Sequence, residues 1–500
     1  MKALIKPTLL LAIVALCLFE FVLDRQIGMF REFEFVLLET QWMLLVCLAV
    51  WCGTFLFLTF SLKDLPLIGL LLIAIAAYFI SQTENSPATD TITILFGVTL
   101  GRAIRFFVYS GGRRKPAPTK KAGTGHSELT SAATFLIGLV LLLAFSAFWH
   151  LDMTNNFYRG PRWMGLWNNP NDYGLLMSAG LVLAMGLLMG IWDLEFGVQN
   201  SMRSFAVRWF GKDRRRGDES HSGNPQLEIE NQKVVTDSLR RPLPILLFVT
   251  VLMLGTGLFF SYSRGAWVGT ATGLLYLAKA HGKFKWWGVL LPVFIAMVVI
   301  CFFWNNTPDN APWYLKRLDL SRASTQHRVA AWKAGFEIMR DHPFGVGWNK
   351  AASFYEKNYS PPEGGAAAIT TNDYLMLGTQ MGIPGLVCFV AYVALCFRNH
   401  PGFVAADVRR LHLKSRKSEP PHVGSYSLMG SEEGIIASPV TRHIPPAITC
   451  HSAMLAMAVA FWFDYGLFKL ATASVFWILL ELGAETGLAA KWHKKAQGKF

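Results

Sequence analysis

The residue that first suggests chemistry is Arg264, which lies in the short sequence SYSRGAWVG at 261–269. The runs on both sides, PLPILLFVTVLMLGTGLFF and TATGLLYLA, carry no charge. A charged side chain in such surroundings is costly, so it is usually paired or functional. No acidic residue lies within several positions of Arg264, although a distant one could fold back. We favour a functional role, and an ion pair with a structural acid is the alternative.

Further arginines lie in segments that the topology below places on the same side of a membrane: Arg159, Arg162, Arg317, Arg322 and Arg328. Clustered guanidinium groups suit a phosphate or pyrophosphate, because each offers planar, bidentate donors and stays charged. For any single one of them, pairing with a local carboxylate or a lipid headgroup is the simpler interpretation.

The stretch STQHRVAAWKAGFEIMRDHPFGVG predicts a helix over about 325–340, capped by Ser324 or Thr325 and stopped by Pro343. Arg328 falls in its first turn, where free backbone N–H groups already favour an anion, and His327 is beside it. An apolar stripe of Val329, Trp332, Phe336 and Met339 also fits a helix lying on the membrane surface, and both interpretations can hold together.

Two polar pairs stand where an apolar helix is expected to begin. In WNNPNDYG, Asn171 or Asp172 could cap the following span, and this structural role is about as well supported as contact with a sugar or phosphate. In TNDYLMLGTQMGIPG, Asn372 or Asp373 could cap a short helix that Gly382 and Pro384 interrupt.

The elements that must position these residues are membrane helices. Of the 500 residues, 52% are hydrophobic and only 16% are charged, and the apolar residues fall in long runs. We expect an all-α polytopic membrane protein with about twelve spans, near residues 5–23, 43–62, 65–80, 91–110, 131–149, 173–191, 243–261, 266–280, 286–304, 384–398, 447–463 and 467–485.

The basic residues orient these spans. One set of loops and span ends holds 33 of the 47 Lys and Arg residues, which places that side and both termini in the cytoplasm. We interpret the basic inserts 111–130, 195–242 and 399–446 as cytoplasmic linkers. Their sequences show no fold that would bind nucleic acid. The outer side carries 150–172, the tip of the turn at Arg264, and the long loop 305–383.

No motif indicates a nucleotide cofactor or a metal site, so no cofactor is expected. The seven cysteines lie within or beside apolar segments without metal-binding spacing, and we interpret them as buried packing thiols.

Four motifs, taken in order, resemble the O-antigen ligase and polymerase superfamily of bacterial envelopes. They are GLWNNPND, SYSRGAWVG, HRVAAWKAGFEIMRDHPFGVGW and NDYLMLGTQMGIPG, and they cover about 160–400. The resemblance implies a glycosyltransferase of the GT-C type in the bacterial inner membrane, inverting and independent of metal. It implies an undecaprenyl-diphosphate-linked glycan as donor, and lipid A core or a growing glycan as acceptor.

By motif, Arg264 and Arg328 match the family's diphosphate-binding arginines. The family commonly carries a His-Asn pair before Gly-x-Pro-Gly, and here the pair is Thr371-Asn372. The candidates for the general base are, in falling order of preference, His327, Asp373, Glu363 and His342. We assign Arg159, Arg162, Asn171 and Asn372 to substrate binding.

These features divide the chain into the following expected parts: N-terminal spans at 1–110, a basic linker at 111–130, a ligase-like core at 131–398, a cytoplasmic insert at 399–446, and C-terminal spans with a basic tail at 447–500. Two other classes stay open. One is a transporter or flippase of lipid-linked glycan. Glu20 and Glu481, which lie within apolar runs, would support this class. The other is a catalytically degenerate member of the family.

Overall fold

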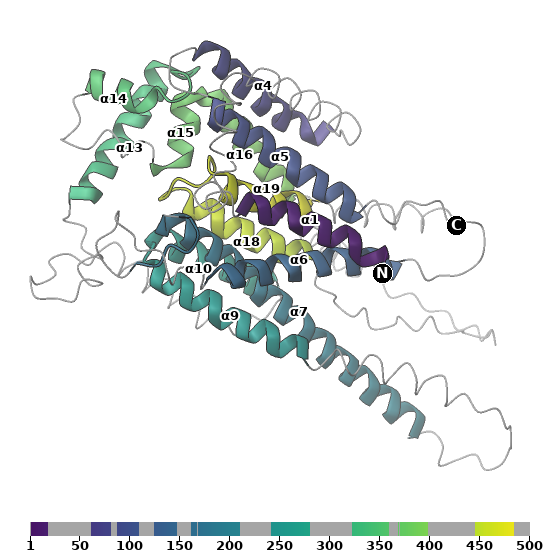
Figure 1. The fold of residues 1–500 in the computed structure, drawn as a ribbon. Helices are drawn as coiled ribbons and strands as arrows, with labels where there is room; N and C mark the ends of the chain where they lie inside the picture. Colours follow the sequence, from purple (N-terminus) through teal and green to yellow (C-terminus); the bar gives the residue numbers. More distant parts are fainter. Residues whose placement is uncertain are drawn as a thin grey trace, which may run out of the picture.

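A computed structural model describes residues 2–18, 62–81, 88–109, 125–147, 162–167, 169–210, 242–280, 323–359, 369, 371–398 and 446–484. These parts form helices joined by turns and short loops, with no strand among them (Figure 1). The helices are α1 Lys2–Leu18, η1 Leu62–Asp64, α4 Leu65–Ile80, α5 Ala88–Tyr109, α6 Gly125–Ala147, α7 Pro170–Phe210, α9 Pro242–Ser261, α10 Arg264–Ala280, α13 Ala323–Asp341, α14 Ala351–Tyr359, α15 Asp373–Gln380, α16 Gly382–Arg398, α18 Pro446–Ala460 and α19 Leu470–Ala484. The all-helical class predicted from the sequence is confirmed for this portion of the chain.

Ten of the twelve expected spans coincide with helices, and the other two, 43–62 and 286–304, lie outside the described residues. By length and composition, two segments can cross a membrane on their own: Pro170–Ile191 of α7 and Pro242–Ser261 of α9. Six further apolar helices are shorter, at 10–17 residues. The count of twelve spans therefore stays a prediction.

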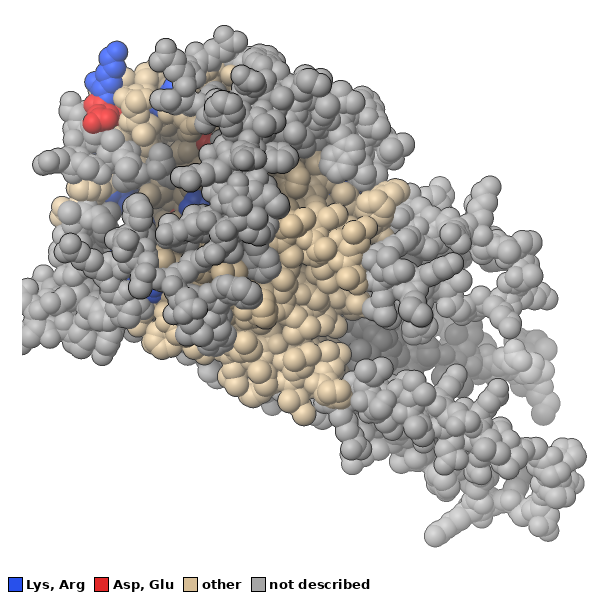
Figure 2. All heavy atoms as spheres, in the orientation of Figure 1, with Lys and Arg blue, Asp and Glu red and all other residues tan. Residues whose placement is uncertain are grey.

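Helix α9 has one side buried in the bundle and another side exposed at its surface. Leu247, Leu254 and Leu258 are buried, and α9 packs along α7. Ile245 and Phe248 on its other side are 65% and 52% exposed. In Figure 2 the described surface over the bundle is tan, without charged atoms, whereas blue and red atoms gather at the end where α13 lies in Figure 1. An apolar, uncharged belt of this kind is what contact with lipid chains requires.

Helices α10 and α18 approach closely because three glycines face the contact. A Cβ atom on Gly265 would lie 2.6 Å from Asp464 Oδ2, and one on Gly273 would lie 2.6 Å from the Ser452 carbonyl oxygen. Gly269 between them abuts the Ala456 carbonyl. Such small residues at four-residue spacing let two membrane helices pack backbone to backbone. They fix the start of α10, and hence Arg264, against the end of α18.

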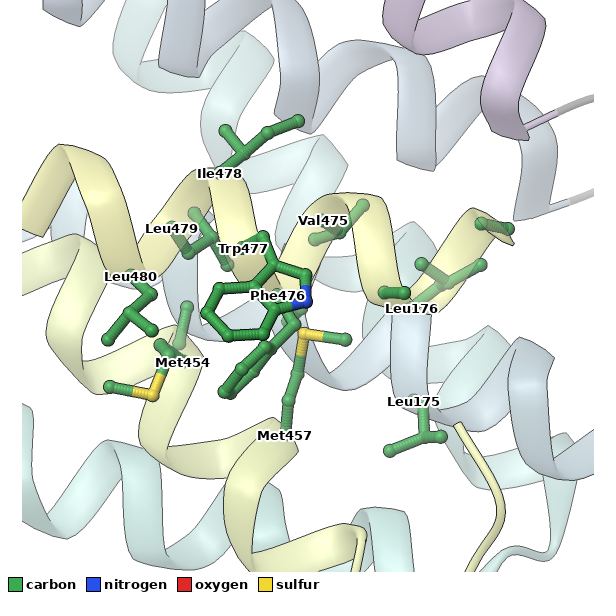
Figure 3. Packing of buried hydrophobic residues seen from close by; sticks show 14 of the residues in the cluster. Leu175, Leu176, Met454, Met457, Val475, Phe476, Trp477, Ile478, Leu479 and Leu480 are labelled. Carbon is green, nitrogen blue, oxygen red and sulfur yellow. The ribbon is translucent and has the colours of Figure 1, made fainter. Parts of the chain in front are cut away.

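Helix α19 runs through the centre of the bundle, and its residues from Ala471 to Gly483 are all buried. Figure 3 shows Phe476 and Trp477 packed toward Met454 and Met457 of α18, close to the start of α7. The loop before α19, residues 461–469, is therefore held by a rigid helix on each side.

A cluster of buried charges ties α19 to α5 and α16. Glu481 Oε1 lies 2.9 Å from Arg102 Nε, and Glu481 Oε2 lies 2.9 Å from Arg105 Nη1. Arg102 also pairs with Asp64, and the Tyr392 hydroxyl donates to Glu481. Glu481 is fully buried and Arg102 is 3% exposed. Two basic and two acidic side chains thus neutralise one another inside the bundle.

Replacing Glu481 by glutamine is expected to destabilise the protein strongly, because Arg102 and Arg105 would keep buried charges without their carboxylate. Breaking a buried pair from one side costs about 3–5 kcal/mol. The melting temperature in detergent should fall clearly. Arg340→Gln on α13, whose partner Asp341 is solvent-exposed, should leave it unchanged. Equal melting temperatures for both variants would contradict this role of Glu481.

The ends of α1 and α4 contact the segments that precede α7 and α14. The Trp167 indole N–H donates to the Leu18 carbonyl at the end of α1, at 2.8 Å. The Trp348 indole N–H donates to the Ala74 carbonyl in the last turns of α4, at 2.9 Å. Helices α13, α14 and α15 lie at this end of the molecule (Figure 1).

Candidate functional site

The turn between α9 and α10 is built by its two serines. Ser263 Oγ accepts from the Ala266 amide at 3.3 Å, and its carbonyl accepts from the Trp267 amide at 3.1 Å, so Ser263 caps α10. The Ser261 hydroxyl accepts from the Ser263 amide at 3.2 Å. Tyr262 has a φ of 51°, in the left-handed region that lets the chain reverse. Arg264 is the first residue of α10 and is partly buried.

Asp464, which comes 201 residues after Ser263, folds back onto this turn. The Ser263 hydroxyl donates to Asp464 Oδ2 at 2.9 Å. Gly265 leaves space for the same oxygen, since a Cβ there would lie 2.6 Å from it. Both chain neighbours of Arg264 therefore contact Asp464, which is only 3% exposed. Asp464 is therefore a distant acid that folds back close to Arg264, as the alternative explanation of Arg264 requires.

Helix α13 carries two candidate residues, of which Arg328 is within electrostatic reach of Asp464. His327 and Arg328 are both partly buried. One turn later, the Trp332 ring lies 5.7 Å from that of Trp462 and 6.4 Å from that of Phe463. Because Arg328 precedes Trp332 by one helical turn, it faces the same loop, 461–469.

One local expectation for α13 is wrong and another holds only in part. The helix begins at Ala323, so neither Ser324 nor Thr325 precedes it as a cap. The expected apolar stripe holds only in part, because Val329 and Phe336 are 56% and 55% exposed, whereas Met339 is 6% exposed and Trp332 is partly buried. The other buried side chains are Ala331, Ala334 and Ile338, because α13 packs on α14 and α15.

Arg162 joins the start of α7 to the end of α9. Its Nε donates to the Ser261 carbonyl and its Nη2 donates to Asn171 Oδ1, both at 2.9 Å. Arg162 was expected to bind substrate, but these two of its N–H groups donate to protein oxygens. Arg159 lies outside the described residues, as do Arg317, Arg322 and Glu363.

The cap of α7 is Asn169, and the expectation of Asn171 or Asp172 in this role is wrong. The Asn169 carbonyl accepts from the Tyr173 amide at 3.1 Å, and Asn169 Oδ1 accepts from the Asn171 amide at 2.9 Å. Pro170 then occupies the first helical position, where it is favoured. This leaves Asp172 in the first turn, where its Oδ2 lies 2.5 Å from Lys469 Nζ.

Asn372 caps α15, as one of the two expected options. Its Oδ1 accepts from the amides of Tyr374 and Leu375 at 3.0 and 3.1 Å. Asp373 is 1% exposed, and its Oδ2 accepts from the amides of Gly466 and Leu467, each at 2.9 Å. Asp373 therefore holds the loop 461–469 in place. Burial raises the pKa of its carboxyl well above the usual 3.8.

Asp464 is the electrostatic centre of this arrangement. Burial raises the pKa of its carboxyl, while the charge of Arg328 and the hydrogen bond from Ser263 lower it, as do the charges of Arg162 and Lys469. Basic groups from α13, the 162–167 segment and the 461–469 loop are thus all within electrostatic reach of one carboxylate. Such an arrangement of preorganised cations can bind and stabilise a polyanion.

Asp464 and Lys469, which lie in FWFDYGLFK between the last two expected spans, were not among the candidates from the sequence. A polar break between two apolar runs on the outer side was the available signal. Of the other base candidates, His342 is exposed and its ring lies 4.9 Å from that of Phe354. Thr371 is partly buried beside Asn372.

Comparison with known proteins adds to this geometry. Residues 248–390 match the family model described as O-antigen ligase. This match to part of the chain supports the resemblance to the O-antigen ligase superfamily. Members of this family are integral membrane proteins that act in glycan transfer of the O-antigen ligase or polymerase type. Neither the curated proteins nor the solved structures compared with the chain gave a match.

The O-antigen ligase segment contains only part of the site. Arg264, His327, Arg328, Asn372 and Asp373 lie within it. The partners that surround them lie outside it, on the start of α7 and on the 461–469 loop: Arg162, Asn171, Asp172, Asp464 and Lys469. The GLWNNPND motif is likewise beyond the matched residues, so the resemblance at about 160–172 stays an expectation.

Proposed function

We propose that this protein transfers or polymerises glycan from an undecaprenyl-diphosphate-linked donor at the periplasmic face of the inner membrane. The observation that carries the proposal is the gathering of Arg328, Arg162 and the Ser-Arg-Gly turn around Asp464, within a family of glycan-transferring membrane proteins. A diphosphate is the group for which clustered, fixed guanidinium groups are suited.

The proposed transfer reaction explains why cations gather at this site. An acceptor hydroxyl attacks the anomeric carbon, the bond from that carbon to the diphosphate oxygen breaks, and the hydroxyl proton passes to a base. Charge then grows on the departing prenyl diphosphate. Donors already aimed at that position lower the barrier without reorganising, and the loss of one such donor at other sites costs about 10²–10³ in rate. We assign this role to Arg264 and Arg328.

His327 is our first candidate for the base. It is partly buried and directly precedes Arg328 on α13, which would place the proton acceptor beside the diphosphate site. Asp373 is less suited than its place in the motif suggested, because one of its oxygens already binds two backbone amides. Thr371 cannot act as a base near neutral pH. Metal independence and inversion come with the family resemblance and are part of the proposal.

Aromatic rings around the turn support its placement at the membrane surface. The ring of Phe259 lies 5.9 Å from that of Tyr262 and 6.2 Å from that of Trp267, and Trp163 stacks on Phe260 at 4.6 Å. Amphipathic aromatic residues are enriched at headgroup depth. A prenyl chain in the bilayer would then present its diphosphate at the level of Arg264.

The buried charges of Arg102 and Glu481 are the observation that favours the alternative, a transporter of lipid-linked glycan. Both are paired with partners from neighbouring helices, which a purely structural role also explains. The experiment below treats transport, and a degenerate family member, as separate outcomes.

The test is to delete the gene in its host and to profile surface glycan and lipid-linked intermediates. Loss of a ligase leaves polymerised chains on the carrier, and loss of a polymerase leaves single units at the outer face. Single units retained at the cytoplasmic face would indicate a transporter. An unchanged glycan profile would indicate a degenerate member, and either of these last two results would overturn the proposal.

A further inference from the structure

Lys469 forms an ion pair that the chemistry above does not use. Its Nζ lies 2.5 Å from Asp172 Oδ2 and 5.7 Å from the centre of the Tyr465 ring. The lysine side chain is 33% exposed, whereas that of Asp172 is 5% exposed. The ammonium group therefore stands between buried carboxylates and the exterior of the protein.

This lysine belongs to the same electrostatic cluster as the arginines. Its charge lowers the pKa of Asp464, as do the charges of Arg328 and Arg162. It reaches the cluster from the start of α19, whereas Arg328 reaches it from α13. The two cations thus approach Asp464 from different elements.

Helix stability does not explain the position of Lys469. The residue immediately precedes Leu470, the first residue of α19, where the positive end of the helix dipole disfavours a cation. Its partner Asp172 comes from α7, 297 residues earlier. A cation held at an unfavourable helix end by a distant acid is more readily explained by binding than by folding.

The Lys469 ammonium group has more N–H donors than the described acceptors use. A lysine carries three N–H donors, and among the described residues its one hydrogen-bond acceptor is Asp172. Because the side chain is one-third exposed, the remaining donors are accessible to an incoming anion. A compact ammonium binds phosphate as a point charge, without the fixed fork of an arginine.

We propose that Lys469 is a further substrate-binding residue, which contacts the phosphate oxygens of the prenyl diphosphate from the α19 side while Asp172 positions it. This inference rests on the proposed function. Asp172 and the Tyr465 ring keep the ammonium at the edge of the site, so that the diphosphate lies between Lys469 and Arg328.

The test measures binding of farnesyl diphosphate, a short prenyl diphosphate, to the full-length protein in detergent by calorimetry. Lys469→Met should weaken binding about tenfold or more, and Lys469→Arg should restore most of it because the charge returns. Lys333→Met, an exposed lysine on α13, is the matched control and should bind as the wild type does. Melting temperatures are recorded for every variant.

A second variant controls for misfolding of Lys469→Met. Lys469→Met alone leaves Asp172 buried without its cation, so the double variant Asp172→Asn with Lys469→Met removes both charges. It should fold and still bind at least tenfold more weakly than Asp172→Asn alone. Binding equal to that of Asp172→Asn would overturn the proposal, as would unaltered binding by folded Lys469→Met.

Arg328→Gln separates this inference from the proposed function. If the wild type binds the probe, Arg328→Gln weakens binding and Lys469→Met does not, then the inference about Lys469 fails and the proposed function stands. If the wild type itself fails to bind farnesyl diphosphate, both fail.

Discussion

Arg264→Ala is expected to abolish glycan transfer while the protein still folds and inserts into the membrane. Arg264 is the first residue of α10, and the backbone around it is fixed by the cap at Ser263 and by the contact of Gly265 with Asp464. A guanidinium group carried on a backbone held this firmly can stabilise the departing diphosphate with little reorganisation. We expect transfer to fall by about 10³-fold, the upper range for loss of one fixed donor.

Arg264→Lys tests the geometry of the contact separately from its charge. Lysine keeps the positive charge but loses the planar, bidentate fork. Most of the activity should therefore be lost, although less than in the alanine variant. Activity is measured as glycan transferred per molecule of folded protein, so that changes in expression do not enter.

The competing explanation is that Arg264 serves to neutralise Asp464, whose side chain touches both neighbours of Arg264. In that case the alanine variant would lower the melting temperature, and activity per folded molecule would stay near that of the wild type. Arg340→Ala, an exposed arginine at the same end of the molecule, controls for the general loss of positive charge. Near-normal transfer by Arg264→Ala would exclude the catalytic role.

Hydropathy predicted much of the helical fold, because it acts locally along the chain. Ten of the expected spans coincide with helices, and the caps follow short-range chemistry. At α7 the expected caps were Asn171 and Asp172, but Asn169 is the cap and is followed by Pro170, which is favoured directly after a cap. The glycines at 265, 269 and 273 could have been recognised as a close-packing face from their spacing alone.

The composition of the site could be predicted only in part. Arg264, His327 and Arg328 could be chosen as candidates because basic residues stand out in an apolar sequence. Asp464 was missed because its partner Ser263 lies 201 residues away, and no local pattern links the two. Arg162 was expected to face substrate, and the structure shows it bonded to Ser261 and Asn171. Which donors remain for a ligand depends on such long-range contacts.

Asp464→Asn is expected to reduce transfer about 100-fold while binding of farnesyl diphosphate is kept. The asparagine has the same shape and can still accept from the Ser263 hydroxyl, so the turn should keep its conformation. It removes the charge that Arg328, Arg162 and Lys469 share. Without that charge the cations repel one another, and the positions required in the transition state are lost. In this variant the Asp464 carboxylate no longer competes with an anionic ligand for the cations. The affinity for farnesyl diphosphate should therefore equal or exceed that of the wild type.

The dependence on pH provides an independent readout. Burial raises the pKa of the Asp464 carboxyl above its usual 3.8. Between 3.8 and the raised value, the folded protein binds more protons at this site than the unfolded chain does. The contribution of Asp464 to stability is therefore fully present below 3.8 and is lost as the pH rises through that window. In Asp464→Asn the slope of stability with pH should be smaller by this contribution, while the contribution of Asp373 remains.

The matched control is Asp341→Asn, an exposed carboxylate at the end of α13. It should leave transfer and farnesyl diphosphate binding unchanged, since the partners of Asp341 among the described residues are its neighbour Arg340 and the Tyr359 hydroxyl. The rate of transfer and the dissociation constant are measured on the same preparations of each variant. A parallel loss of both in Asp464→Asn would show that Asp464 maintains the whole binding site. Unchanged transfer would show that the arginines keep their positions without it.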